Sequence, residues 1–501
     1  VLHFDGSRFR VGPDSAGADP GPACYRNGGP LTVTDANVML GRVQPEHFPH
    51  VFGPGGDQPL DREVVRRRFT DLAEEVSAAT GEPRSPEEVA EGFVAIAVAN
   101  MANAVRTISV QKGHDVTEYV LTTFGGAGGQ HACAVADALG IRTVVVPPFA
   151  GVLSALGIGL ADVRAMREQS VEKHMGDTLM LHLDDLAARL TEVVVGELVS
   201  QDVEPAAIAT TVRALVRYDG TDTALSVPLA SPQQMRDEFE AGYRRTYSFL
   251  MDRPLVVEAL SVEAVGHRGD VDITDPIPHA GSPDEKPTAH ASVRQVVDGD
   301  WCDVPLRARS TLASDEVLPG PAISTEPDAT TVVEPGWVAR RLDRGHLVLT
   351  RETAPPASDA DTAVDPVLLE VFNNLFMSIA EQMGARLEST AQSVNIKERL
   401  DFSCALFDPA GNLIANAPHM PVHLGSMGES VRTIIRLRGG GMRPGDVYAL
   451  NNPYNGGTHL PDVTTVMPVF GATGEVQFYT ASRAPVSYTH LTLPTNRVAG
   501  G

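Results

Sequence analysis

The chain has 501 residues, of which 43% are hydrophobic and 21% charged, so it can bury the cores of about two to four domains. Its 64 acidic and 40 basic residues give a formal net charge of -24, and this negative field disfavours nucleic-acid binding. No apolar run reaches the roughly 18 residues of a membrane span. Four widely spaced cysteines without a CxxC pair indicate reduced thiols in the cytoplasm.

The first segment, residues 1–168, alternates strand and helix signals. Its opening, VLHFDGSRFRVG, already reads as a strand, so we expect a missing beginning. Ser85 and Glu88 form a capping box for a long amphipathic helix, and Asp35 is the predicted cap of an earlier one. EYVLTTF, HACAVADALG and TVVVPPF then predict a strand, a helix and a strand. This order is typical of an α/β domain with parallel pairing.

The later segments differ from the first in composition and in the pattern of predicted elements. Residues 169–351 predict a β-rich domain, because one amphipathic helix precedes many short strands with Gly and Pro turns. Residues 352–366 are rich in proline and lack apolar periodicity, which predicts a linker. Residues 367–483 begin with a strong helix, and DFSCALFDPAGNLIANAP then predicts a hairpin that turns at DPAGN. We therefore expect an α/β multidomain protein.

FGGAGGQH, residues 124–131, is a glycine-rich turn between a predicted strand and a predicted helix. Gly125, Gly126, Gly128 and Gly129 have no side chains, so backbone N–H groups can approach a phosphate or an adenine closely. The pattern matches neither the GxGxxG fingerprint nor the Walker A motif. On its own, the motif leaves nucleotide contact and a purely structural turn both open.

Two histidine-containing stretches are candidates for a metal site. NNPYNGGTHLPDV places His459 three residues before Asp462, and an imidazole with a carboxylate is a common pair of divalent-metal ligands. APHMPVHLGSM places His419 and His423 four residues apart, and its prolines predict that this stretch is not helical. Metal sites need at least three protein ligands. The pattern therefore leaves a metal site and structural, hydrogen-bonded histidines both open.

Together these stretches resemble the hydantoinase family. LHFDGSRFRVGPDSAGADPGPACYRNGG, FGGAGGQHACAVADALGI and PFAGVLSALGIGLADVR resemble hydantoinase A, and GPAISTEPDATTVVEPGW resembles its C-terminal β domain. SVNIKERLDFSCALFDPAGNLIANAPHMPVHLGSM and GDVYALNNPYNGGTHLPDVTTVMPVF resemble the start of hydantoinase B. Both modules in one polypeptide are the arrangement of the fused ATP-dependent 5-oxoprolinases.

The resemblance implies ATP-dependent hydrolysis of 5-oxo-L-proline to L-glutamate. It implies that an actin-like ATPase in hydantoinase A phosphorylates the lactam, with ATP near the four glycines of the turn, and that hydantoinase B carries the hydrolytic chemistry. It implies a divalent ion (Mg, Mn or Zn) at His459 and Asp462, and it places His419 and His423 in an active-site segment without assigned roles. The implied partners are a small-molecule lactam and, for the full-length protein, further copies of itself, with no nucleic acid and no membrane.

By this resemblance, residues 1–168 are the C-terminal part of the actin-like domain, residues 169–351 the C-terminal β-rich domain of hydantoinase A, and residues 367–483 the N-terminal part of hydantoinase B. Two departures predict a truncated, inactive piece. The GGTxTD hairpins that bind phosphates in actin-like ATPases do not occur, and APVSYTHLTLPTN follows Arg483 where the family continues GHHADIGG.

The last residues, 484–501, are expected to be an assembly artefact, because VSYTHLTLPT resembles the translation of a transposon-end adapter used in sequencing-library preparation. Two other functions stay open at this stage. One is an ATP-dependent enzyme of the same family that acts on N-methylhydantoin or resembles acetone carboxylase. The other is a non-catalytic protein that binds a nucleotide or a partner.

Overall fold

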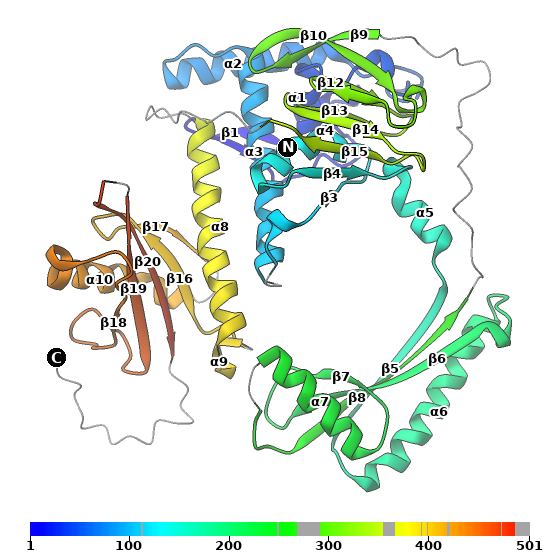
Figure 1. Ribbon diagram of the computed structural model, residues 1–501, viewed down its shortest axis with the longest axis vertical. Helices are drawn as coiled ribbons and strands as arrows, with labels where there is room; N and C mark the ends of the chain where they lie inside the picture. The colour runs from blue at the N-terminus through cyan, green and yellow to red at the C-terminus, as the bar shows by residue number, and fades with distance from the viewer. Residues whose placement is uncertain are drawn as a thin grey trace. The chain divides into compact units, whose positions relative to one another are not determined.

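The computed structural model describes residues 1–111, 114–247, 250–267, 291–353, 366–391, 393–397, 399–417, 421–471 and 473–485. The chain forms two compact units, Val1–Gly157 with Asp272–Ile379 and Ile158–Val271 with Ala380–Gly501 (Figure 1). His419, residues 354–365 of the predicted linker and residues 486–501 lie outside the described residues, so the predictions for them stay untested.

The helices and N-terminal strands of the first unit are β1 (Leu2–Phe4), β2 (Phe9–Val11), α1 (Val33–Met39), α2 (Arg62–Thr80), α3 (Pro86–Gln111), α4 (Gly128–Leu139) and α5 (Leu153–Leu160). The predicted capping box of α3 is confirmed, because Glu88 N–H donates to Ser85 Oγ at 3.1 Å and Ser85 N–H donates to Glu88 Oε2 at 2.6 Å. For α1 the prediction was one turn off. Thr32 is the N-cap, and Asp35 lies in the first turn, where it accepts from Thr32 N–H at 2.8 Å.

Among the described residues, one helix is long and apolar enough to cross a membrane by length and composition alone. It is the stretch Pro86–Ser109 of α3, predicted from the sequence as a long amphipathic helix, and its most apolar window of 18 residues has a mean hydropathy of 1.2. In the structure 44% of that window is buried, and Val89, Phe93 and Ile96 belong to the hydrophobic core of the first unit. Helix α3 contacts α1, α2, α4 and β2, which is the packing of a core helix.

The sheet strands of the first unit are β3 (Leu121–Thr122), β4 (Thr143–Val146), β9 (Ala291–Val297), β10 (Asp300–Ala308), β11 (Val317–Pro319), β12 (Ala322–Thr325), β13 (Thr330–Val333), β14 (Trp337–Arg341) and β15 (Leu347–Arg351). They form a five-stranded sheet of order β11-β14-β15-β4-β3 and a four-stranded sheet of order β13-β12-β10-β9. Strands β3 and β4 are parallel and joined through α4, which confirms the predicted strand, helix and strand.

The compact units differ from the sequential limits predicted at residues 168 and 351. Strand β15 pairs with β4, with Leu347 opposite Val146, so strands from the predicted second domain complete a sheet of the first. Trp337, Leu347 and Leu349 are fully buried in the same core as Val144 and Val146. This pairing joins segments far apart in the chain, and burial of the apolar face of β4 provides its driving force.

Residues 158–267 form an antiparallel sheet of order β5-β8-β6-β7 with two helices (Figure 1). The elements are β5 (Val163–His174), α6 (Asp177–Val199), β6 (Ile208–Tyr218), β7 (Leu225–Pro228), α7 (Pro232–Tyr247) and β8 (Leu255–Gly266). Leu183 of α6, Phe239 of α7 and Val257 of β8 are fully buried and share one core. The core of this segment is separate from that of the first unit. Two long helices accompany the strands here, and the β-rich domain predicted for residues 169–351 stays a prediction.

The last segment is an antiparallel sheet of order β17-β16-β20-β19-β18, against which α10 packs. Its elements, with the helices that precede it, are α8 (Pro366–Thr390), α9 (Val394–Lys397), β16 (Ser403–Phe407), β17 (Leu413–Asn416), α10 (Pro421–Arg438), β18 (Tyr448–Leu450), β19 (Asp462–Phe470) and β20 (Val476–Pro485). The predicted hairpin is confirmed as β16 and β17. The prediction of a non-helical stretch around His423 was wrong. Pro421 begins α10, a position where its missing N–H needs no helical partner.

Candidate functional site

The glycine-rich turn FGGAGGQH connects β3 to α4 in the first unit. Gly125 has a φ of +87°, and a Cβ added there would meet no heavy atom within 4 Å. Gly128 is the first residue of α4. The N–H groups of Gly126, Ala127 and Gly129 have no acceptor among the described residues. Unpaired N–H groups at the start of a helix favour an anion, because the helix dipole adds positive potential there.

Two of the four glycines are also required by packing. A Cβ added at Gly126 would lie 2.7 Å from Asp328 O, and one at Gly129 would lie 2.6 Å from Thr331 Oγ1. The chain before β13 therefore lies directly against the turn, and Thr330 N–H donates to Gly126 O at 3.3 Å. These contacts show that close packing alone accounts for two of the glycines. The unpaired N–H groups of the turn can still bind an anion.

A buried polar network lies next to this turn and was not predicted. The two hydrogens of Asn37 Nδ2 point to Gln130 Oε1 and His131 Nε2, each at 3.1 Å. Arg42 donates to Gln130 O at 2.6 Å and to Glu334 Oε1 at 2.5 Å. Burial, together with the nearby Arg42, lowers the pKa of His131 to about 4, so its ring is neutral at pH 7. The network fixes the first turn of α4 to α1 and to the residue after β13.

In the second unit the structure brings three predicted residues together. His459 Nδ1 lies 3.1 Å from Asp462 Oδ2, and His423 Nε2 lies 3.9 Å from the same oxygen. Asp401 Oδ1 lies 3.9 Å from His423 Nε2 and was not predicted. Asp462 begins β19, His459 precedes it in a turn, and His423 lies in the first turn of α10. The cluster therefore draws on segments about 60 residues apart, which only the folded sheet brings together.

Burial differs among these side chains. His423 is buried, and burial lowers its pKa despite the opposing effect of Asp462, so its ring is neutral at pH 7. Ser403 Oγ lies 3.2 Å from His423 Nδ1. Asp462 is also buried and accepts from Thr458 Oγ1 at 3.3 Å, whereas the His459 side chain is 74% exposed. Because a carboxylate only accepts, His459 Nδ1 carries the hydrogen, and the lone pair on Nε2 stays available to a ligand.

Arg483 of β20 is fully buried beside this cluster, and its role was not predicted. Its guanidinium donates to Thr464 Oγ1 and Ser430 Oγ, both at 2.6 Å, and also to Ser426 Oγ. It lies 3.4 Å from His423 O. Among the described residues no carboxylate lies within 4.0 Å of this guanidinium. Arg483 therefore ties the first turns of α10 to β19 and β20 through neutral oxygen atoms.

Imidazoles and carboxylates together are donors typical of divalent-metal sites, and His423, His459, Asp401 and Asp462 supply both kinds. As arranged, no group of three or more His, Cys, Asp or Glu in the described part of the chain is placed to hold an ion. The cluster thus fits a divalent ion in its chemistry and lacks a closed set of ligands within the described residues.

Three domain descriptions of one family match successive parts of the chain. Hydantoinase/oxoprolinase (hydantoinase A) matches residues 1–167, the hydantoinase/oxoprolinase C-terminal domain matches residues 171–353, and hydantoinase B/oxoprolinase matches residues 365–487. The chain belongs to the hydantoinase/oxoprolinase family. The glycine-rich turn falls in its hydantoinase A domain, and the histidine and aspartate cluster falls in its hydantoinase B domain.

Curated relatives extend this similarity along the whole chain. The 5-oxoprolinase of Saccharomyces cerevisiae is 39% identical over 498 residues, which cover 97% of this chain and 39% of that protein. The 5-oxoprolinase 1 of Arabidopsis thaliana is 40% identical over 495 residues, which cover 96% of this chain and 39% of that protein. The chain therefore spans well under half the length of these relatives.

Two solved structures share the mixed α/β multidomain fold. Acetone carboxylase in its nucleotide-free state has a TM-score of 0.55 and 22% identity, with 70% of this chain and 51% of that chain covered. The ATP-dependent caprolactamase of Pseudomonas jessenii has a TM-score of 0.50 and 24% identity, with the same shares covered. At this level of identity the likeness shows the fold alone.

Proposed function

We propose that this chain is part of an ATP-dependent 5-oxoprolinase, which converts 5-oxo-L-proline, ATP and water to L-glutamate, ADP and phosphate. The observation that carries the proposal is the 39–40% identity to two proteins named 5-oxoprolinase, which runs through the hydantoinase A and hydantoinase B domains alike. The finer domain assignment belongs to the same proposal, with residues 1–168 as the C-terminal part of an actin-like ATPase domain.

The chemistry explains why ATP is needed. A lactam carbonyl is a poor electrophile, because its nitrogen donates electron density into the carbonyl. Transfer of the γ-phosphoryl group of ATP to the lactam oxygen turns that oxygen into a good leaving group. A first water attacks the same carbon, and the ring C–N bond breaks as its nitrogen takes up a proton, which leaves an acyl phosphate. A second water then hydrolyses this acyl phosphate to the carboxylate of glutamate and free phosphate. Binding residues for ATP and a proton-transfer site for hydrolysis are therefore both required.

The glycine-rich turn is the proposed contact for ATP. The unpaired N–H groups of Gly126, Ala127 and Gly129 can donate to an acceptor on the nucleotide, and Gly125 leaves room for it. Phe124 is 58% exposed next to these groups, which gives a planar ring a surface to pack on. The buried network around His131 would hold the turn in place during binding.

The cluster of His423, His459 and Asp462 is the proposed hydrolytic site, with a divalent ion held by His459 and Asp462. A divalent ion at such a site acts as a Lewis acid on oxygen atoms. Asp462 fixes the tautomer of His459 through the 3.1 Å contact, and His423 is kept neutral by burial, so it can accept a proton at Nε2.

The test uses the purified full-length protein that contains this chain. ADP and glutamate are measured with ATP and 5-oxoproline, and in parallel with N-methylhydantoin, with caprolactam, and with acetone plus bicarbonate. We expect ADP and glutamate to form together with 5-oxoproline alone. Phosphate release with one of the other substrates and none with 5-oxoproline would show that the substrate is wrong. No ATP hydrolysis with any of them would favour a non-catalytic binding protein.

A further inference from the structure

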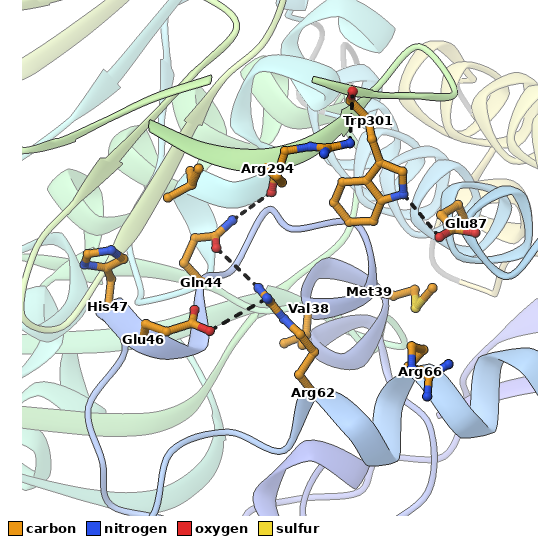
Figure 2. Close-up of a pocket in the computed structure, with 11 residues that line it drawn as sticks. Val38, Met39, Gln44, Glu46, His47, Arg62, Arg66, Glu87, Arg294 and Trp301 are labelled. Carbon is orange, nitrogen blue, oxygen red and sulfur yellow. Dashed lines mark hydrogen bonds and ion pairs between the residues drawn. The ribbon is translucent and has the colours of Figure 1, made fainter. Parts of the chain in front are cut away.

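A cavity of about 550 Å³ lies in the first unit, and none of its lining residues belongs to the glycine-rich turn (Figure 2). It is open to solvent on one side and is lined by residues of α1 and the segment after it, the first turns of α2, the start of α3, and strands β9 and β10. Its volume falls within the roughly 300–1,000 Å³ typical of sites for small organic molecules. An inorganic ion alone would leave most of this space empty.

One buried side chain holds the walls of this cavity together. Gln44 Nε2 donates to Gly41 O at 2.6 Å and to Arg294 O at 3.0 Å, and its Oε1 accepts from Arg62 Nη2 at 3.3 Å (Figure 2). Gly41 has a φ of +69°, and a Cβ added there would clash with Arg294 O, so the backbone of β9 lies directly against this segment. The cavity is therefore formed before any ligand arrives, which lowers the entropy cost of binding.

Three arginines line the cavity, and among the described residues none of them forms a buried ion pair. Arg62 lies 3.7 Å from Glu46, and both side chains are about half exposed. Among the described residues Arg66 forms one ion pair, with Glu63 outside the cavity, and both side chains are largely exposed. Arg294 has no carboxylate partner in the described part of the chain. Exposed ion pairs of this kind contribute about 0–1 kcal/mol, so an incoming anion can replace them.

An aromatic and apolar surface faces the same space. The Trp301 ring is 41% exposed, its indole N–H donates to Glu87 Oε1 at 3.2 Å, and the Arg294 guanidinium lies 5.7 Å from the ring centroid (Figure 2). Val38 and Met39 add apolar atoms from the end of α1. A fixed indole beside guanidinium groups suits a ligand that combines a planar ring with a negative charge.

We propose that this cavity binds an aromatic organic anion of nucleotide size, with its phosphate or carboxylate on Arg62, Arg66 and Arg294 and its ring against Trp301. The formal net charge of the chain is -24, whereas the cavity is lined by three arginines and two glutamates. The net charge of the lining is therefore positive, opposite in sign to that of the whole chain. The site is separate from the ATP contact proposed above, and the proposal does not depend on the reaction that the protein catalyses.

The experiment follows the fluorescence of Trp301 in the full-length protein. AMP is the test ligand, and adenosine, inorganic phosphate and citrate supply the ring alone, the anion alone and a non-aromatic organic anion. The difference between the protein and its Trp301→Phe variant isolates the signal of this indole, since Trp337 of the chain is fully buried. We expect AMP to change this signal in a saturable way, and to bind at least about tenfold more tightly than the other three ligands.

Two neighbouring arginines of α2 give a matched pair of variants. Arg66 lines the cavity, whereas Arg67 is exposed on the same helix and does not. Arg66→Ala removes one charge-assisted contact and should weaken AMP binding about tenfold, which corresponds to about 1.4 kcal/mol. Arg67→Ala removes the same charge from the helix and should leave binding unchanged. Circular dichroism of both variants checks that α2 is still folded.

Several outcomes would overturn the proposal. Equal weakening by Arg66→Ala and Arg67→Ala would show only a long-range charge effect. Inorganic phosphate or citrate binding as tightly as AMP would show a simple anion site, and adenosine binding as tightly would show that the guanidinium groups do not contribute. An AMP signal that persists unchanged in Trp301→Phe would place the bound nucleotide elsewhere, such as at the glycine-rich turn.

Discussion

Replacing Arg483 with lysine tests whether a buried guanidinium positions the hydantoinase B cluster. In the structure this side chain reaches Ser426 and Ser430 of α10 and Thr464 of β19 at the same time. Lysine keeps the positive charge but presents a single nitrogen on a flexible stem, so it cannot span all three hydroxyl groups. The substitution therefore separates the charge of Arg483 from its fork geometry.

The magnitude follows from the contacts that are lost. A lysine ammonium that keeps one hydroxyl contact loses two hydrogen bonds to a charged group, each of about 1.5–3 kcal/mol. The hydroxyl groups partly recover, because Ser430 Oγ also donates to Gly456 O. We therefore take the lower end, about 3 kcal/mol, as the loss of local stability where α10 meets the sheet. A loss of this size speeds amide hydrogen exchange through local opening on the order of 100-fold.

The loss of local stability is measured as the rate of amide hydrogen exchange in α10. Mass spectrometry of the full-length protein gives this rate. Arg432→Lys is the control, since Arg432 lies on the same helix, is about half exposed and is 3.5 Å from Glu429. A half-exposed pair of this kind contributes about 0–1 kcal/mol, so the control should exchange nearly as the unaltered protein does. If Arg483→Lys and Arg432→Lys exchange alike, the fork of Arg483 does not hold α10 in place and the reasoning fails.

Three further predictions address the two candidate sites. Gly129→Ala should destabilise the first unit by more than about 1 kcal/mol in chemical denaturation, because the added Cβ would crowd Thr331. The control is Gly157→Ala, at a helical position with open space around it, which should be neutral or stabilising by up to about 1 kcal/mol. The opposite order of the two stabilities would contradict the packing of the turn. Folding lowers the pKa of His131 from 6.5 to about 4, so the unfolded chain binds one more proton between these two pH values. The free energy of unfolding should therefore be highest above pH 6.5 and should fall by about 1.4 kcal/mol per pH unit toward pH 4. In urea titrations, His131→Gln should remove this slope. Asp462→Asn should lower the affinity for Zn²⁺ or Mn²⁺ at least about tenfold in equilibrium dialysis, and an unchanged affinity would place the ion elsewhere.

Local features of the sequence predicted local structure well. The capping box of Ser85 and Glu88 and the hairpin turn at DPAGN were confirmed, and both were predictable because their hydrogen bonds join residues only two to four positions apart. The prediction around Pro421 was wrong because proline breaks the interior of a helix but is favoured at its first position, which is where Pro421 lies in α10. The pairing of β15 with β4 had no local signal, because burial of two distant apolar strands determines it.

At the candidate sites too, contacts between residues close in the sequence were predictable and contacts between distant residues were not. The contact between His459 and Asp462 was predictable because they lie three positions apart in the sequence, whereas Asp401 and Arg483 come close to His423 only in the folded sheet. Nothing in the segment around Arg483 shows that its side chain is buried, since arginine is usually exposed. A structure was needed to find it.

Both candidate sites contain buried polar groups, which are uncommon in protein interiors. Arg42 and Arg483 are both buried guanidinium groups that bind oxygen atoms from distant segments, and His131 is buried neutral with its Nδ1 unpaired in the described structure. Desolvation of such groups is costly, and apolar side chains of similar volume often stabilise a fold at least as well. In each unit the polar residues surround the first turn of a helix, α4 in one and α10 in the other. We infer that their common role is to hold that turn in one orientation, since a site misplaced by about 1 Å can lose about 100-fold in rate.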